Sequence, residues 1–294
     1  MVREMNIICK VERLLVFADV AFRKTSHFVT DSTGAYSSAS NPTNYLYLIS
    51  AKRNTNYLEG VTTLDLIHIQ RHILGITPFT NVFNVIASDI TNDTKVRASD
   101  LNSLRKLILG VTIKFENESW RFIDKKDTTL NINDPFPYAE IVRIENFQNS
   151  VSDADFIGIK IGDVNGTTDK ELLNHEIESR IAPVKLMMVI DDNNSNGETT
   201  QLKILAPQDG KYFGVQMALR HGDTPLDVVG HKLDVKSENQ YDKLPVWRLS
   251  YDISEGIQLA KGEVLFTINI PRNEVSNVQL DDSIRPEFYI DNNG

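Results

Sequence analysis

The order of apolar and polar residues divides the chain into two strand-rich regions with a helical stretch between them. Segments rich in aromatic and β-branched residues, a composition typical of strands, occupy 16–22, 27–31 and 45–52. Because no helical pattern interrupts the segments after residue 183, we predict a β-sandwich there. Its expected strands are 185–190, 200–205, 212–220, 228–235, 246–251, 263–270 and 287–290.

A repeated segment lies between the two strand-rich regions. Residues 66–75, LIHIQRHILG, return as residues 101–110, LNSLRKLILG, and each copy follows an aspartate, Asp65 or Asp100. The offset between the two aspartates is 35 residues (100 − 65). A unit this short cannot bury its apolar face alone, so we expect the two copies to pack together as one small helical module.

The twelve residues that end at Asp100 have the spacing of a calcium-binding loop. Oxygen-bearing side chains stand at loop positions 1, 3, 5 and 12. Calcium takes about six to eight oxygens, from alternate residues of such a loop and from one backbone carbonyl. We therefore predict that calcium is bound by Asp89, Thr91, Asp93, the carbonyl of Lys95, and Asp100.

The matching loop of the first copy, residues 54–65, is a weaker ligand set. Asn54, Asn56 and Asp65 stand at ligand positions, but position 5 is Leu58, whose side chain has no oxygen. Low ligand charge weakens calcium binding. We expect this loop to bind calcium only with ligands from elsewhere in the chain.

A phrase after the repeats, Gly162-Asp163-Val164-Asn165-Gly166, is similar to the opening of a calcium loop. One interpretation is that Asp163 and Asn165 fold back to supplement the first loop, while the strand before them pairs beside the strand at 45–52. The alternative is an ordinary Gly/Asn turn that ends a strand at 156–161.

Two loop–helix units of this kind, each closed by Asp and ended by Leu-Gly, resemble a type I dockerin. The matching residues make up about a fifth of the chain. The resemblance implies a calcium-binding module that binds a cohesin-like partner through its two helices. The implied contact residues are Leu66, Ile69, Gln70, Arg71, Leu101, Leu104, Arg105 and Lys106.

The flanking regions carry weaker resemblances. A Thr-Asp-x-x-Gly-x-Tyr turn at 30–36 resembles the transthyretin-like, carboxypeptidase-regulatory β-sandwich. The first strand of such a domain is not recognisable in residues 1–14, so we expect a truncated sandwich. The phrases at 214–219, 246–251 and 262–268 resemble a cohesin-like domain. A dockerin-like and a cohesin-like unit on one chain leave open that they dock to each other or link neighbouring copies.

These patterns predict a multidomain, mainly β chain, in which two β-sandwich units flank a small α-helical, dockerin-like module. Within the insertion that follows the module, Trp120 and Phe122 are expected to be core anchors, and an aromatic platform for sugar is the alternative. The expected parts are a truncated transthyretin-like sandwich at 1–53, the calcium repeat pair at 54–112, the insertion with a returning strand packed on that module at 113–169, a linker at 170–182 and a cohesin-like, carbohydrate-binding-like sandwich at 183–294.

Composition and charge limit the classes of partner and the cellular location that we expect for the chain. The net charge of −9 argues against nucleic acid, and no apolar run reaches the 18 or so residues of a membrane-spanning helix. Cys9 is the single cysteine, which excludes an intramolecular disulfide. Residues 1–10 lack the layout of a signal peptide. Since dockerins work outside the cytoplasm, we expect an interior piece of a longer bacterial secreted or cell-surface protein.

Motifs for catalysis are absent from the sequence. His68 and His72 are spaced four apart and could bind zinc from one helix face, but the glutamate of a metalloprotease motif is missing. Packing or solvated histidines are the alternative. We expect a non-catalytic, calcium-binding segment that mediates assembly or adhesion with a cohesin-like protein or a glycan. The alternative is an accessory part of a polysaccharide-degrading enzyme whose catalytic domain lies outside this sequence.

Overall fold

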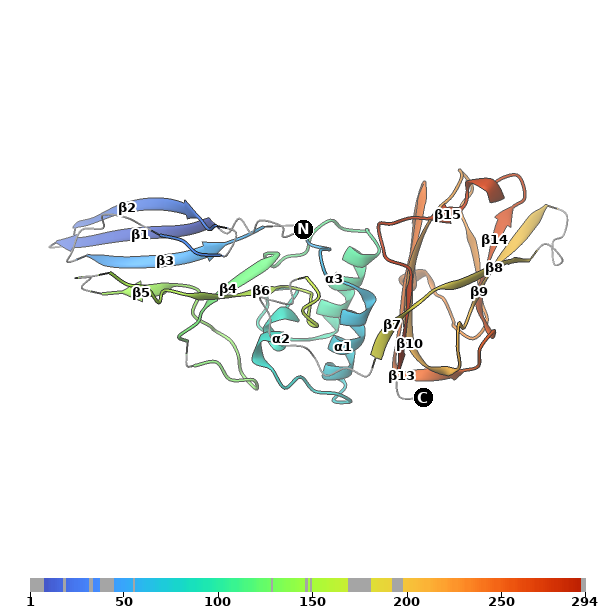
Figure 1. Cartoon of the computed structure of the whole chain (residues 1–294), viewed down its shortest axis with the longest axis horizontal. Helices are drawn as coiled ribbons and strands as arrows, with labels where there is room; N and C mark the ends of the chain where they lie inside the picture. Colours follow the sequence, from blue (N-terminus) through green and yellow to red (C-terminus); the bar gives the residue numbers. More distant parts are fainter. Residues whose placement is uncertain are drawn as a thin grey trace. The chain divides into compact units, whose positions relative to one another are not determined.

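The chain is mainly β, as predicted, and its computed structural model divides into two compact units (Figure 1). The model describes residues 8–17, 20–31, 34–37, 45–54, 56–127, 129–145, 148, 150–168, 181–191 and 198–291. Unit 1 comprises Met1–Glu59, Phe79–Lys95 and Glu116–Glu176, and unit 2 comprises Gly60–Pro78, Val96–Phe115 and Ile177–Gly294. Each predicted calcium loop therefore starts in unit 1 and ends in unit 2.

A four-stranded antiparallel sheet lies at the start of unit 1, with the order β2-β1-β3-β5. Its strands are β1 (Ile8–Phe17), β2 (Val20–Val29), β3 (Leu46–Lys52) and β5 (Val142–Ile144). The expected strand at 16–22 is wrong, because these residues span the change of direction between β1 and β2, where Phe17 pairs with Val20. The expectation of no first strand in residues 1–14 is also wrong: β1 covers residues 8–14, the described part of that range, although its charged residues hide the alternation.

The Thr-Asp-x-x-Gly-x-Tyr turn follows β2 and ties it to the rest of unit 1. Asp31 Oδ1 accepts the amide of Ala35 at 3.0 Å, and Gly34 adopts a φ of 81°, which glycine reaches without strain. The Tyr36 hydroxyl donates to the carbonyl of Ala154. This tyrosine also packs against the apolar cluster formed around β3, so the turn serves as a corner of the sheet's core.

A second, two-stranded sheet of unit 1 pairs β4 (Trp120–Asp124) with β6 (Phe156–Lys160). The expected pairing of this returning strand beside 45–52 is wrong, because β1 and β5 take the two edges of β3. A short helix that the sequence did not suggest, α2 (Val82–Ala87), completes the unit.

The aromatic pair on β4 belongs to the core, as expected. Trp120 and Phe122 are 3% and 4% exposed, and their rings stack with centroids 6.3 Å apart. The Arg53 guanidinium lies over the Trp120 ring at 4.6 Å. A sugar ring therefore has no open aromatic face at this place.

Two sheets in unit 2 enclose one apolar core, as the sandwich prediction requires. The first sheet has the order β12-β13-β10-β16-β7, with β15 beside β10, and the second has the order β11-β14-β9-β8. The strands are β7 (Ile181–Lys185), β8 (Met187–Asp191), β9 (Thr199–Leu205), β10 (Gly210–Arg220), β11 (Asp227–Gly230), β12 (Gln240–Lys243), β13 (Val246–Leu259), β14 (Val264–Pro271), β15 (Gln279–Leu280) and β16 (Glu287–Asp291).

Strand boundaries in the sandwich differ from the expected ones. The strand expected at 228–235 ends at Gly230, and β13 continues eight residues past Tyr251, to Leu259. Ile253, Ile257 and Leu259 of the extension pack on the core, but Glu255 and Gly256 interrupt the apolar alternation used to predict strands. Its backbone still pairs with the start of β10, up to Gly210 opposite Leu259.

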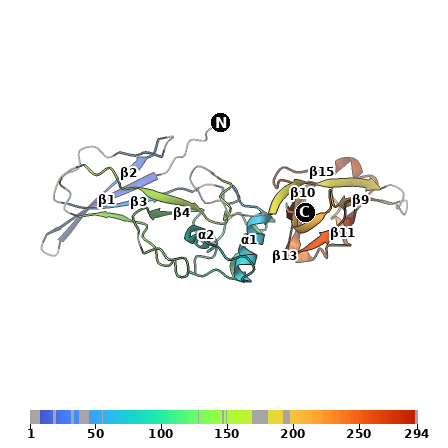
Figure 2. The ribbon, with the colours of Figure 1, turned by 60° about the horizontal axis from the view of Figure 1, so that its bottom comes forward.

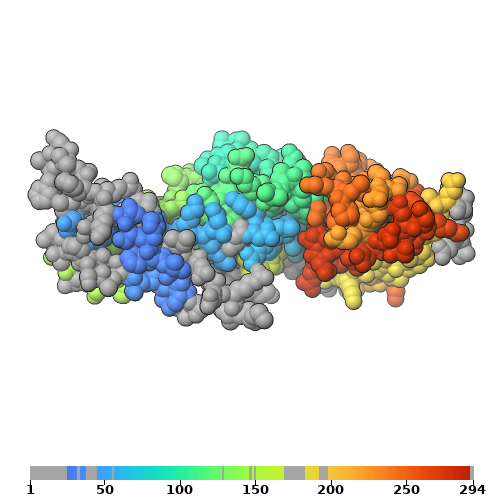
Figure 3. All heavy atoms as spheres, turned by 90° about the horizontal axis from the view of Figure 1, so that it is seen from above, coloured from blue at the N-terminus to red at the C-terminus, as the bar shows by residue number. Residues whose placement is uncertain are grey.

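The repeat helices α1 (Thr63–Ile73) and α3 (Ala98–Ile108) belong to unit 2. They pack against each other, and α1 lies on the face of β10 and β13 that points away from the core (Figure 2). The C-terminal strands of the sandwich, coloured orange to red, form one contiguous block of atoms (Figure 3).

Candidate calcium loops and helix-docking face

The last residue of each predicted calcium loop caps the helix that follows. Asp65 Oδ2 accepts the amide of Thr62 at 2.8 Å, and Asp100 Oδ2 accepts the amide of Arg97 at 2.9 Å. Both aspartates are fully buried and stand in the first helical turn, where a negative charge is favourable. Each helix thus starts two residues before its loop ends.

The two helices also end alike. Gly75 and Gly110 have φ values of 70° and 72°, and the residue after each returns its amide to a carbonyl of the last turn. This is the left-handed cap that glycine permits. A Cβ at Gly110 would also lie 2.7 Å from Arg248 Nη1, so the second helix end abuts the sandwich closely.

The first half of the second loop is bent by its own side chains. Asp89 Oδ1 and Oδ2 accept the amides of Asp93 and Thr94 at 2.9 and 3.0 Å. Asp93 Oδ1 accepts the amide of Lys95 at 3.0 Å. Asn92 and Thr94 have φ values of 59° and 65°, a conformation that curls the chain locally. This curled backbone suits a loop that surrounds a cation.

The calcium ligand set of this loop stays a prediction. Asp89, Thr91, Asp93 and Lys95 lie in unit 1, and Asp100 lies in unit 2. Within the described residues, no three His, Cys, Asp or Glu side chains form a metal-binding group. A calcium loop also draws on hydroxyl and backbone carbonyl oxygens, so the donor types present fit that ion.

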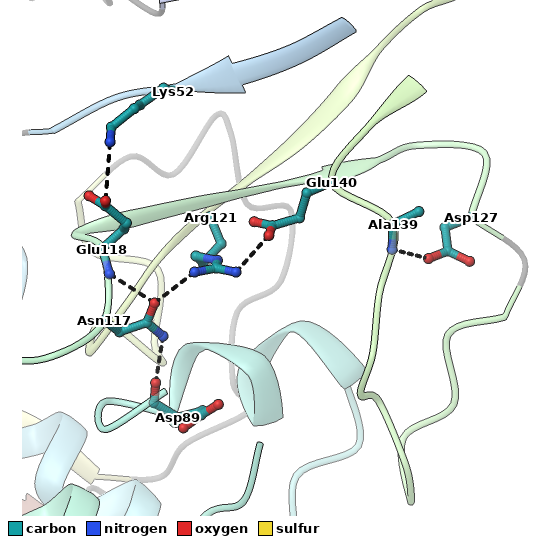
Figure 4. A network of polar contacts seen from close by, with 8 residues as sticks. All are labelled: Lys52, Asp89, Asn117, Glu118, Arg121, Asp127, Ala139 and Glu140. Carbon is teal, nitrogen blue, oxygen red and sulfur yellow. Dashed lines mark hydrogen bonds and ion pairs between the residues drawn. The ribbon is translucent and has the colours of Figure 1, made fainter. Parts of the chain in front are cut away.

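A polar network fixes the start of the second loop (Figure 4). Asn117 Nδ2 donates to the carbonyl of Asp89 at 2.7 Å, and Asn117 Oδ1 accepts from Arg121 Nη1 at 3.1 Å. Arg121 Nη2 pairs with Glu140 at 2.6 Å. Lys52 pairs with Glu118 at 3.1 Å and, as the largest cause, lowers the pKa of that carboxyl. The loop entrance is therefore tied to β4 and β3.

Asp163 forms a turn with the same hydrogen bonds as Asp89. Its Oδ1 and Oδ2 accept the amides of Thr167 and Thr168 at 3.0 and 2.7 Å, four and five residues on. Burial raises the pKa of its carboxyl. Thr168 Oγ1 donates to the carbonyl of Glu59 at 3.0 Å, so the segment lies against the first loop. The ligand roles of Asp163 and the half-buried Asn165 stay predictions.

The first half of the first loop uses its amide side chains for hydrogen bonds. Asn54 Oδ1 accepts from Ser119 Oγ at 3.2 Å, and Asn56 Oδ1 accepts the amide of Leu58 at 3.0 Å. The ammonium of Lys160 donates to the carbonyl of Tyr57 at 2.8 Å. Sequence reasoning missed this lysine, although a single charge inside the apolar run Phe-Ile-Gly-Ile-Lys-Ile was the available clue.

A helix-docking face joins α1 and α3 to the sandwich within unit 2. Leu64 and Ile67 of α1 form an apolar cluster with Phe213 and Tyr289 of the sheet. The approach is close: a Cβ at Gly214 would lie 3.0 Å from Ile67 Cδ1. Burial raises the pKa of Tyr289 well above its usual value and keeps the phenol neutral.

Polar groups surround this apolar centre. The amide of Thr63, the first residue of α1, has no carbonyl partner within the helix and donates to Gln216 Oε1 at 2.8 Å, and the Thr63 and Ser250 hydroxyls are 2.7 Å apart. All three residues are buried. Because unpaired buried donors are costly, these bonds fix the helix in one position on the sheet.

Two arginines complete the docking face. Arg105 Nη2 pairs with Asp252 Oδ1 at 2.6 Å, and the Asp252 side chain is only 2% exposed. Arg71 Nη1 donates to the carbonyl of Ser254 at 2.5 Å, and its guanidinium lies 5.0 Å from the centre of the Phe213 ring.

The residues implied as partner contacts differ in burial and do not form one exposed face. Arg71 and Arg105 contact the sandwich of the same chain. Leu66, Ile69, Leu101 and Leu104 are buried, Gln70 is half-buried and Lys106 is exposed. The apolar centre of the docking face comes instead from Leu64 and Ile67. The assignment of the implied contact residues to an external partner stays a prediction.

The two histidines of α1 differ in burial, and their zinc-binding and packing interpretations both stay predictions. His68 is buried, and desolvation followed by the nearby Arg71 charge lowers its pKa to about 4. His72 is half-buried, and burial lowers its pKa. Both rings are therefore neutral near pH 7.

None of the helices described in the structure is long and apolar enough to cross a membrane. Comparisons of the chain with protein-family models, with curated proteins and with solved structures found no match.

Proposed function

We propose that this chain is a non-catalytic structural module of a secreted or cell-surface protein, in which the repeat helices dock onto the module's own β-sandwich. The observation that carries the proposal is the helix-docking face of unit 2. It combines an apolar centre with a partly buried ion pair, Arg105–Asp252, and a hydrogen bond from the first helix residue, Thr63, to the sheet. Such a polar and apolar complement is characteristic of a specific interface.

In this proposal the cohesin-like partner of the helix pair is the sandwich of the same chain. The helices then serve architecture, and adhesion to a protein or a glycan uses other surfaces of the module. Burial of Leu64 and Ile67 supports this, because a second partner could reach them only after the helices leave the sheet.

Calcium is the proposed cofactor of the second loop. Asp89, Thr91, Asp93, the Lys95 carbonyl and Asp100 would hold it. The ion would neutralise the three carboxylates at the loop and hold the curled backbone that their hydrogen bonds already favour. No hydrolysis of glycans, esters or peptides is expected.

Charge reversal tests the docking in solution. Arg105→Asp places a second carboxylate beside the buried Asp252, so we expect strong destabilisation and faster hydrogen exchange of α1 and α3 amides. The pair Arg105→Asp with Asp252→Arg should restore part of the stability, because it restores opposite charges. Lys106→Asp is the matched control, since that side chain is exposed.

The proposal requires the double variant to be more stable than either single variant. Additive losses in the two single variants, or equal exchange rates in Arg105→Asp and Lys106→Asp, would show that the helices do not dock at Asp252. A chain that turns over a glycan, with loss of turnover on one carboxylate substitution, would contradict the non-catalytic part.

A further inference from the structure

Lys160 is an unusual residue for its place in unit 1. It is the last residue of β6, lies opposite Trp120 of β4 in the sheet, and is 0% exposed. Lysine is almost never fully buried unless its charge is compensated, because the ammonium loses its hydration. Its contacts must therefore supply that compensation.

The contacts of the ammonium come from the first loop and from the segment that precedes Asp163. Nζ donates to the carbonyls of Tyr57 at 2.8 Å and of Ile161 at 3.2 Å. The positive charge also acts on the Asp163 carboxylate. Backbone carbonyls are among the oxygen ligands that a metal cation uses in a loop of this type, and the Asp163 carboxylate interacts with the ammonium only through its charge.

The turn at Asp163 also holds the first loop through hydrogen bonds. Asp163 accepts the amides of Thr167 and Thr168, and the Thr168 hydroxyl holds the carbonyl of Glu59. The first loop is therefore fastened at two alternate carbonyls, that of Tyr57 through Lys160 and that of Glu59 through Thr168.

We infer that the Lys160 ammonium is the resident cation of the first loop and takes the place that calcium would take in the second, a comparison that rests on the proposed function. The first loop has the neutral Asn54, Asn56 and Leu58 where the second has Asp89, Thr91 and Asp93. A loop with so little negative charge holds a divalent ion weakly, and a buried ammonium beside it repels that ion further. One fixed positive charge matches the charge of Asp163 without any metal.

Two measurements on the full chain test this inference, and neither depends on whether the second loop binds calcium. The first is calcium titration calorimetry of Asp100→Ala, in which the second loop is disabled. The second is an ¹⁵N-detected ammonium spectrum, in which a buried, hydrogen-bonded lysine remains visible while exposed lysines exchange with water. Lys160→Met identifies the peak, and Lys125→Met, at an exposed lysine, is the matched control.

We expect no calcium heat in Asp100→Ala and a protected ammonium peak that calcium leaves unchanged. Lys160→Met should lower the melting temperature in chelator far more than Lys125→Met does. The inference is overturned if Asp100→Ala still binds an ion that Asp163→Ala abolishes, or if calcium displaces the ammonium peak. The absence of a protected ammonium peak would overturn it as well.

Discussion

The first and second repeats start and stop their helices with the same hydrogen bonds, yet their loops are held in different ways. Asp65 and Asp100 cap the helix starts, and Gly75 and Gly110 close the helix ends. In contrast, the first loop is fastened by Lys160, about a hundred residues along the chain, whereas the second is curled by its own Asp89 and tied at its start by Asn117. The helix limits are thus encoded locally, whereas the loop depends on distant residues.

The two helices also meet the sandwich with different chemistry. At one pair of equivalent positions α1 has Ile67 and α3 has Asn102, and at another α1 has Gln70 and α3 has Arg105. Ile67 lies in the apolar centre of the docking face, and Arg105 forms its partly buried ion pair. Divergence at these two positions lets α1 supply the apolar centre of the docking face and α3 supply its ion pair.

Truncation of Ile67 in the first repeat should give the largest difference in stability from the equivalent substitution in the second repeat. Ile67→Ala should lower the free energy of unfolding by about 3–4 kcal/mol, because it removes buried methylenes and leaves a cavity beside Phe213. Asn102→Ala, at the equivalent exposed position of α3, should change it by less than about 0.5 kcal/mol. Denaturant unfolding of both variants checks this, and similar losses would contradict the docking of α1.

The parts of the fold that sequence predicted are those with short-range causes. Asp and Leu-Gly at a fixed offset identified both helices, and the curl of the second loop follows from Asp89 and Asp93. Turn residues and apolar alternation located most strands of the sandwich.

The parts that sequence did not predict have long-range causes. Nothing near Lys160 in the sequence shows that its ammonium reaches Tyr57, about a hundred residues away. The pairing of β6 with β4 instead of β3 depends on β5 taking the edge of β3. The docking of Thr63 to Gln216 and Ser250 likewise joins residues that no local pattern connects.

Acid should weaken the first repeat through His68, a position that is Ser103 in the second. Its pKa is lowered to about 4 in the folded chain from 6.5. Between these values the unfolded chain binds one more proton, so the stabilisation is complete above pH 6.5 and is lost as pH falls towards 4. The loss should be about 3 kcal/mol.

His68→Leu removes this titration, so its free energy of unfolding should fall less steeply than that of the unaltered chain over the same pH range. His72→Leu is the control, since that ring is only half-buried and should change the slope less. Equal slopes for the unaltered chain and His68→Leu would show that the ring is not buried in solution.

Calcium should stabilise the chain through the second loop alone. At a free calcium concentration one hundred times the Kd, the expected gain is about 2.7 kcal/mol. Asp93→Ala should abolish the response of the melting temperature to chelator. Leu58→Ala, at the equivalent position of the first loop, should keep that response even if the half-buried leucine itself contributes stability. A response lost in both variants would mean that the two loops bind metal as one site.

A small gain should come from relief of backbone strain at the second loop. Thr94 adopts a φ of 65°, which a β-branched residue tolerates poorly, while the first loop places Gly60 at a φ of 75° near the same point. Thr94→Gly keeps the amide that donates to Asp89, because that bond uses the backbone. The relief of about 1–2 kcal/mol is partly offset by the greater freedom of glycine in the unfolded chain, which leaves roughly 0.5–1 kcal/mol of added stability.

Asn92→Gly is the control: the φ of Asn92 is 59°, but asparagine tolerates this conformation, so the gain in stability should be smaller. Chemical unfolding in chelator separates this backbone effect from metal binding, and a loss of stability in Thr94→Gly would contradict the left-handed turn at this position.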